Sequence, residues 1–218
     1  MNIHSFIGAY HNHPILFIGT GLSLRYLTVS YTWDALLKKI AIELSGKNEY
    51  YLDVKAQSQI DGNFRYDLIG AKLEGDFTEA LMKDRDGNFR HVNDKFYELM
   101  EEGLNVSRLK IYISMLLEST ETKPEMASEL AELKKIGKNI GSIITTNYDR
   151  FIESFLNFIP LVGNDILLSN PYGAVYKIHG CITDPTKIIL TDSDYDRFNK
   201  NYELIRAQLL SLFIHNPI

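Results

Sequence analysis

Apolar and polar residues follow one another along the chain in blocks whose spacing predicts strands and helices. The first block reads ILFIG, at 15–19, and is a short apolar run that ends at a glycine. A run of this kind is typical of a strand that is buried on both faces of a sheet. The next block, WDALLKKIAIEL at 33–44, repeats apolar residues at helical spacing between Thr32 and Gly46. The two blocks predict a strand, a glycine-containing loop and a helix.

Charged residues become frequent between 47 and 139, and the apolar residues there recur every three or four positions. The segments FTEALMK, DKFYELMEEG, RLKIYISMLLES and PEMASELAELKKIG show this repeat. The spacing predicts helices, with turns at 61–63 and 86–88, both of which read Asp-Gly-Asn. We therefore expect an α-helical insertion at 47–139.

Strand character returns in GSIITTNYD, at 141–149, where a β-branched run lies between a glycine and a polar cluster. The segment DRFIESFLNF then predicts a helix. Further strands are predicted at 165–169, 174–180 and 187–191, and one helix with an acidic first turn is predicted at 191–213. This alternation predicts an α/β fold with a Rossmann-like parallel sheet flanked by helices.

Two pieces of the sequence, 1–46 and 140–218, are expected to form one α/β core, which the segment 47–139 interrupts. The last residues, FIHNPI, stop where another apolar strand would begin. We therefore expect the core to be truncated at its C-terminus and the chain to be part of a longer protein.

The formal charge of −5, from 28 acidic and 23 basic residues, gives no general attraction toward nucleic acid or an anionic membrane. Neither direct nucleic-acid binding nor membrane association is expected. The N-terminal residues do not resemble a signal peptide, so we expect a cytoplasmic protein. The single cysteine, Cys181, excludes an internal disulfide and a zinc site built from several cysteines of this chain.

A pair of glycines, Gly19 and Gly21, directly follows the first predicted strand. Glycines in this position let a backbone approach a phosphate, and a helix that begins near Ser23 would add its N-terminal amides. A dinucleotide fingerprint would have a third glycine where Leu24 stands. Taken alone, the pair is therefore weak evidence for a ligand, and a tight turn that binds none explains it better.

Polar clusters follow two more of the predicted strands. The first contains Thr146, Asn147 and Asp149, and the second places His179 before a glycine. Open α/β sheets bind ligands at the carboxyl ends of their strands, and a histidine can take up a proton near neutral pH. Each cluster also has a structural alternative, because the first could cap a helix and the histidine could be a packed core residue.

Together and in this order, FIGTGLS, ITTNYD and KIHG resemble the motifs of the sirtuin family, which are a GAGxS loop, a TQNxD segment and an HG dipeptide. The resemblance is closer to divergent bacterial SIR2-like domains. In these, TTNYD and K(I/L)HG replace the deacetylase motifs, and W-x-x-L-L follows the glycine loop, as in TWDALL. The resemblance implies that 1–46 and 140–218 form a Rossmann-like, NAD-binding SIR2 core.

The resemblance also implies a role for each matching residue. Asn147 would orient the nicotinamide ribose or a water, and His179 would act as the general base. Asp149 would lie near the nicotinamide amide. The residues that would bind NAD are Gly19, Thr20, Gly21, Ser23, Thr146 and Asp149.

Deacetylating sirtuins have four zinc-binding cysteines after the HG dipeptide, whereas here Cys181 stands alone. The zinc module is therefore expected to be absent, with the helical insertion in its place, and protein deacylation is disfavoured. The resemblance implies an NAD+ hydrolase that releases nicotinamide and ADP-ribose, with NAD as substrate and no metal. The alternatives are a regulatory module that binds NAD or ADP-ribose without turnover, and an ADP-ribosyl transferase.

SIR2-like domains of this kind occur in bacterial anti-phage systems, where NAD+ depletion follows a trigger. The resemblance implies the same role here, in a homo-oligomer. It also implies a fused or separate partner of one of three kinds: an ATPase, an Argonaute-like protein or a sensor domain.

Overall fold

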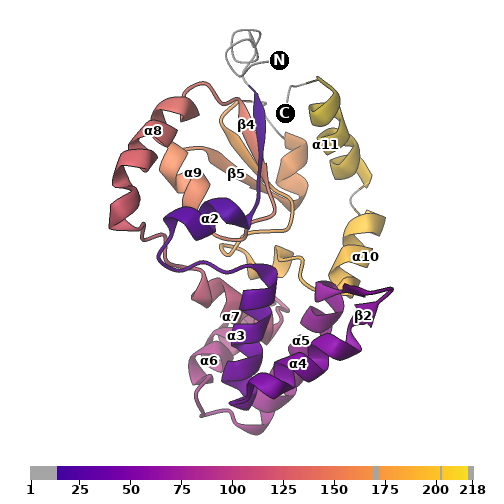
Figure 1. Cartoon of the computed structure of the whole chain (residues 1–218). Helices are drawn as coiled ribbons and strands as arrows, with labels where there is room; N and C mark the ends of the chain where they lie inside the picture. Colours follow the sequence, from indigo (N-terminus) through magenta and orange to yellow (C-terminus); the bar gives the residue numbers. More distant parts are fainter. Residues whose placement is uncertain (1–13, 169–171, 202, 216–218) are drawn as a thin grey trace.

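The computed structural model describes residues 14–168, 172–201 and 203–215. A sheet covered by helices lies in the upper half of Figure 1, and a group of helices lies below it. The four-stranded sheet is parallel, with the strand order β1-β4-β6-β5. Its strands are β1 (Ile15–Ile18), β4 (Ser142–Thr145), β5 (Ile159–Val162) and β6 (Ala174–Lys177). The Rossmann-like α/β fold expected from the sequence is confirmed.

The register of the sheet aligns the carboxyl ends of all four strands. Ile18 of β1 pairs with Thr145 of β4, which pairs with Lys177 of β6, which pairs with Val162 of β5. Because the strands are parallel, the residues that follow them emerge at one edge of the sheet.

Side chains alternate between the two faces of the sheet, and each face has its own apolar core. On one face, Ile143 and Val175 belong to a cluster with Ile152 of α9 (Phe151–Leu156). On the other, Ile144 and Tyr176 belong to a cluster with residues of α11 (Glu203–His215). Figure 1 accordingly shows α9 and α8 (Ala127–Gly137) on one side of the sheet and α11 on the other.

The lower helices share one large apolar cluster, in which the rings of Phe77 and Tyr112 stack at 5.3 Å. Their bounds are α3 (Trp33–Ser45), α4 (Asn48–Gln57), α5 (Tyr66–Lys83), α6 (Arg90–Glu101) and α7 (Arg108–Leu116). The sequence sets the ends of α3, because the Thr32 hydroxyl accepts a hydrogen bond from the Ala35 amide and Gly46 adopts a φ of 71°.

The proposed division of the chain at residues 46 and 140 cuts across some of this packing. Helix α3 precedes residue 46 but packs on α4 and α5, and α8 precedes residue 140 but packs on α9 beside the sheet. The division itself stays a prediction.

Two predicted strands were wrong. The segment at 165–169 falls in a 3-10 helix, η2 (Gly163–Leu168), with residue 169 outside the described part, and a strand that was not predicted, β5, lies before it. The segment at 187–191 begins at the last residue of another 3-10 helix, η3 (Pro185–Lys187), and pairs with no strand in the described residues. Both segments contain buried apolar residues, and burial alone does not distinguish a strand from other buried backbone.

The start of the first predicted helix needs a correction, because α2 (Thr20–Tyr26) begins directly after Gly19 rather than near Ser23. The helix predicted at 191–213 corresponds to α10 (Asp192–Asn201) and α11, and residue 202 between them is outside the described part. Within 47–139 the structure adds a short hairpin, β2 (Gln59–Ile60) and β3 (Asn63–Phe64), and a 3-10 turn, η1 (Pro124–Met126).

The predictions for the two chain ends concern residues 1–13 and 216–218, which lie outside the described part. Among the helices described, none is both long and apolar enough to cross a membrane.

Candidate active site

The three motifs that the sequence singled out meet at the carboxyl edge of the sheet. Gly19 follows β1, Asn147 lies two residues beyond β4, and His179 lies two residues beyond β6. The register therefore brings the glycine segment next to two segments that follow it by more than a hundred positions in the chain.

The glycine segment is the start of a helix rather than an open loop. Gly19 is the N-cap of α2, with a φ of −104°, so Thr20 and Gly21 lie in the first turn. Neither glycine has a positive φ, and a Cβ added at either would meet no described atom within 4 Å. The two glycines therefore leave open space beside the backbone, which is what close approach of a ligand requires.

A buried hydrogen-bond network connects this helix to the segment after β4. Asn147 donates through Nδ2 to the Gly19 carbonyl at 3.1 Å and to the Ser23 hydroxyl at 2.9 Å. The Ser23 hydroxyl donates in turn to Oδ2 of Asp149 at 2.8 Å, while Oδ1 of Asp149 accepts from the Phe151 amide at 3.0 Å. Burial of these polar groups is stable only because they are hydrogen-bonded to one another.

One atom of the network has no such partner. The Oδ1 of Asn147 is buried and accepts no hydrogen bond within the described part of the chain. Thr146, a further predicted NAD-binding residue, is half-buried next to Asn147 and lies outside the network. The Thr145 hydroxyl fixes the backbone of this segment, because it donates to the Ile18 carbonyl and accepts from the Asn147 amide.

Beneath this network lies an ion pair that the sequence interpretation missed. Lys177, which is 1% exposed, donates to the Asp149 carbonyl and at 2.8 Å to Oε1 of Glu153. A buried ion pair costs desolvation energy, so a lysine at the end of an apolar strand is itself a signal of a specific acceptor. Here the lysine fixes the backbone that carries the Asp149 carboxylate.

Cys181 lies next to this pair. Its Sγ is 4.0 Å from Oε1 of Glu153, and the residue is fully buried. The Cys181 thiol is therefore not exposed at the candidate site.

His179 lies at the same edge of the sheet but is not hydrogen-bonded to Asn147. Its ring packs edge-on against the rings of Trp33 and Tyr195, with ring centroids 6.4 Å and 5.5 Å away. Its Nδ1 is buried and has no hydrogen-bond partner among the described residues. Burial lowers the pKa of His179 from 6.5 to about 4, so the imidazole is neutral at pH 7 and can accept a proton. Trp33 also contacts Tyr148 at 6.0 Å, which links the histidine to the segment that carries Asn147.

The glycine of the HG dipeptide has a structural cause. Gly180 has a φ of +89°, and a Cβ at this position would lie 2.3 Å from the Lys187 carbonyl oxygen. Ile189 also donates its amide to the His179 carbonyl at 3.0 Å, so the misassigned segment at 187–191 forms the backing of the histidine turn.

A cavity of about 530 Å³ opens beside the two rings that hold His179. It lies between the start of α3, the β3–α5 connection and α10. Tyr195 was not singled out from the sequence, because a tyrosine in an acidic first turn has the pattern of an ordinary amphipathic helix. The residues that line the cavity are Trp33, Phe64, Arg65, Tyr66, Asp67, Asp192, Tyr195, Asp196 and Asn199.

Comparison with known families covers part of the chain that forms this site. Residues 141–218 match the family model of the SIR2-like domain. The expected family is confirmed for this segment. No curated protein matches the chain.

The SIR2-like segment contains Asn147, Asp149, Lys177 and His179, whereas Gly19 and Ser23 lie outside the match. The glycine segment joins the SIR2-like segment through hydrogen bonds to Asn147 and Asp149. SIR2-like domains use NAD, so the match indicates NAD-related chemistry. The described residues contain no group of three or more His, Cys, Asp or Glu side chains that could hold a metal ion.

Proposed function

We propose that this chain is an NAD+ hydrolase, which cleaves the bond between nicotinamide and ribose to give nicotinamide and ADP-ribose. The observation that carries the proposal is the buried network that ties Ser23 of the glycine segment to Asn147 and Asp149 of the SIR2-like segment. The network joins Ser23 and Asp149, which are predicted to bind NAD, to Asn147, which is predicted to be catalytic, at the carboxyl edge of a Rossmann-like sheet.

The residues at this edge fit NAD as a substrate. Asn147 has a buried acceptor atom, Oδ1, and His179 a buried ring nitrogen, Nδ1, without a partner in the described residues, and buried polar atoms of this kind are normally hydrogen-bonded. Ribose hydroxyls and a water molecule both donate and accept, so they can satisfy these atoms. The open space beside Gly19 and Gly21 leaves room for the phosphates.

Hydrolysis needs a positioned water and a base. In the proposed reaction the C1′–N bond breaks, and its electron pair neutralises the positive charge of the departing nicotinamide nitrogen. The oxygen of a water bonds to C1′, and the proton of that water passes to His179 and then to solvent. Asn147 holds the ribose or the water in place, and the neutral imidazole of His179 is in the protonation state that this step requires.

An assay of nicotinamide release from NAD+ tests the proposal. His179→Ala and Asn147→Ala should each abolish release, whereas His91→Ala, at an exposed histidine of α6, should leave it unchanged. Equal rates in the wild type and both site variants would exclude hydrolysis at this site. Tight NAD+ binding without any release of nicotinamide would instead favour the regulatory module.

The proposal extends to the cell. We propose that the chain depletes NAD+ during bacterial anti-phage defence, as part of a homo-oligomer and with a fused or separate ATPase, Argonaute-like or sensor partner. The resemblance of its motifs to divergent bacterial SIR2-like domains supports this. Cells that express the chain with its genomic neighbours should lose NAD+ after phage infection, and the His179→Ala chain should abolish that loss.

A further inference from the structure

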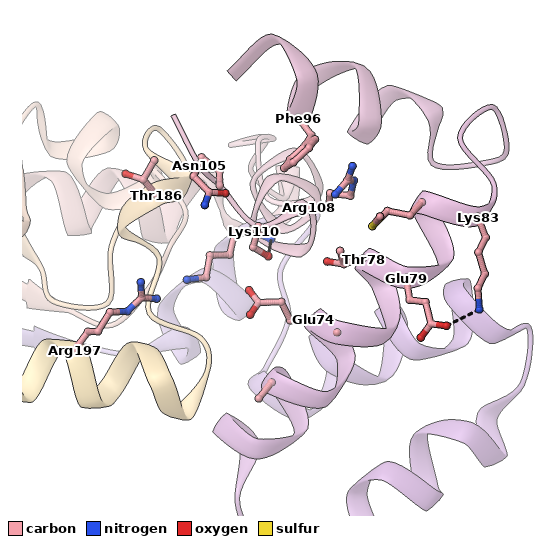
Figure 2. Close-up of a pocket in the computed structure, with 15 residues that line it drawn as sticks. Glu74, Thr78, Glu79, Lys83, Phe96, Asn105, Arg108, Lys110, Thr186 and Arg197 are labelled. Atoms are coloured by element: carbon pink, nitrogen blue, oxygen red, sulfur yellow. Dashed lines mark hydrogen bonds and ion pairs between the residues drawn. The ribbon is translucent and has the colours of Figure 1, made fainter. Parts of the chain in front are cut away.

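A second cavity, of about 930 Å³, is lined by none of the residues of the proposed NAD site. Figure 2 shows the side chains that line it. The cavity is bounded by α5, by the N-terminal end of α7 and by α10. Cavities of 300–1,000 Å³ are typical of sites for small molecules. The polar residues that line it are Glu74, Thr78, Glu79, Lys83, Asn105, Ser107, Arg108, Lys110, Thr186 and Arg197.

Arg108 is a buried cation in the wall of this cavity. The residue is 6% exposed, and its guanidinium carbon lies 3.7 Å from the centroid of the Phe96 ring. Figure 2 shows the two side chains next to each other. It donates hydrogen bonds to neutral groups, the side-chain Oδ1 of Asn93 at 2.8 Å and the Tyr97 hydroxyl at 3.5 Å. No carboxylate pairs with it in the part of the chain that the structure describes. Buried charges are normally paired, so a buried guanidinium without a carboxylate partner is an exception that a negatively charged ligand would remove.

At the α10 side of the cavity, two further cations share one carboxylate. Lys110 and Arg197 both bind Oδ1 of Asp194, at 2.7 and 2.5 Å. The other oxygen of Asp194 accepts from the amides of Leu190 and Thr191. One negative charge therefore faces two positive ones, although the whole chain carries a net charge of −5.

The remaining charges of the lining do not neutralise Arg108. Glu79 is paired with Lys83. Glu74 is half-buried and has no partner among the described residues, and Figure 2 shows it on the side of Lys110 and Arg197. The hydroxyls of Thr78 and Ser107 add neutral donors to the lining.

We infer that this cavity binds a phosphate-bearing small molecule of nucleotide size, with Arg108 as the counter-charge of the phosphate. A guanidinium presents a planar fork of N–H donors that matches phosphate oxygens. Helix α7 begins at Arg108, and its first turn contains no acidic residue that would cancel the positive end of the helix dipole. The dipole therefore adds to the positive potential that Arg108 creates in the cavity. The unpaired Glu74 is an acceptor for hydroxyl or amino groups of the same ligand.

The inference goes beyond the proposed function, and its test does not depend on NAD+ turnover. Inorganic pyrophosphate is the probe, and binding to the full chain is measured by isothermal titration calorimetry at constant ionic strength. Saturable binding with one site is expected, and Arg108→Gln should weaken it at least tenfold. Arg90→Gln, at an exposed arginine of α6, is the matched control and should bind as the wild type does.

A second variant keeps the test decisive if Arg108→Gln fails to fold. Thr78→Glu brings a carboxylate of the protein into the same cavity, so it should abolish pyrophosphate binding without removing any buried cation. Ser23→Ala, which disrupts the network of the proposed NAD site, should leave binding at this cavity intact. Binding that Thr78→Glu leaves unchanged, or that Ser23→Ala abolishes, would overturn the inference, as would the absence of saturable binding.

Discussion

Asn147 donates a hydrogen bond to the Ser23 hydroxyl at 2.9 Å, although the two residues are 124 positions apart in the chain. The bond exists because β1 and β4 are neighbours in a parallel sheet, which brings the residues after both strands to one edge. Ser23 passes the interaction on to Asp149, so three side chains from two segments behave as a unit.

Removal of the Ser23 hydroxyl should therefore destabilise the fold. Ser23→Ala leaves one oxygen of Asp149 and one N–H of Asn147 without their partner in a buried site, and each unsatisfied group costs about 1–3 kcal/mol. Because two groups lose their partner, urea unfolding should show a loss of at least about 2 kcal/mol in the free energy of unfolding. Ser30→Ala, at a half-buried serine outside the network, should change it by less than about 0.5 kcal/mol. Equal stabilities of the two variants would show that the network contributes nothing.

Much of this edge was predictable from the sequence. Three local patterns follow three strands: glycines after the first, a polar cluster after the second and a histidine after the third. A parallel sheet is sufficient to bring such segments together. The contacts of His179 were not predictable, because Trp33 and Tyr195 come from helices whose placement depends on tertiary packing. The strands predicted at 165–169 and 187–191 failed for the same reason, since burial without a neighbouring strand gives irregular or 3-10 backbone.

The buried pair of Lys177 and Glu153 should be sensitive to loss of either partner. Lys177→Met removes the cation and leaves the Glu153 carboxylate buried and unpaired, which costs about 3–5 kcal/mol. The double variant Lys177→Met/Glu153→Leu should regain most of that loss. At an exposed pair, Lys135→Met should change the stability by less than about 1 kcal/mol. Chemical denaturation of the wild type, Lys177→Met, Glu153→Leu and the double variant measures the coupling between the two residues, and additive losses in the double variant would contradict it.

His179 should make the stability of the fold depend on pH in a defined window. Above about pH 6.5 the imidazole is neutral in both the folded and the unfolded chain. Between about pH 6.5 and 4 the unfolded chain binds a proton that the folded chain does not, so the free energy of unfolding falls as the pH falls. The pKa shift limits this loss to about 3 kcal/mol.

A comparison with His179→Gln isolates this contribution from that of the carboxylates. The difference in free energy of unfolding between the wild type and His179→Gln should decrease from pH 7 to pH 4 and stay constant above pH 7. NMR titration of the imidazole gives the pKa directly. A midpoint near 6.5 would mean that His179 is not desolvated in the fold.

Gly180 should tolerate substitution less well than a glycine in an open position. Gly180→Ala combines a φ of +89° with a Cβ placed 2.3 Å from the Lys187 carbonyl oxygen, so the turn that carries His179 must move. The positive φ alone costs about 1 kcal/mol, and the steric contact adds to that cost. Gly75→Ala is the matched control, because it lies inside α5 with no described atom within 4 Å of its Cβ and should stabilise the helix by about 0.5–1 kcal/mol. Thermal unfolding should therefore shift in opposite directions for the two variants, and nicotinamide release should fall only in Gly180→Ala, since displacement of the turn misplaces the proposed base.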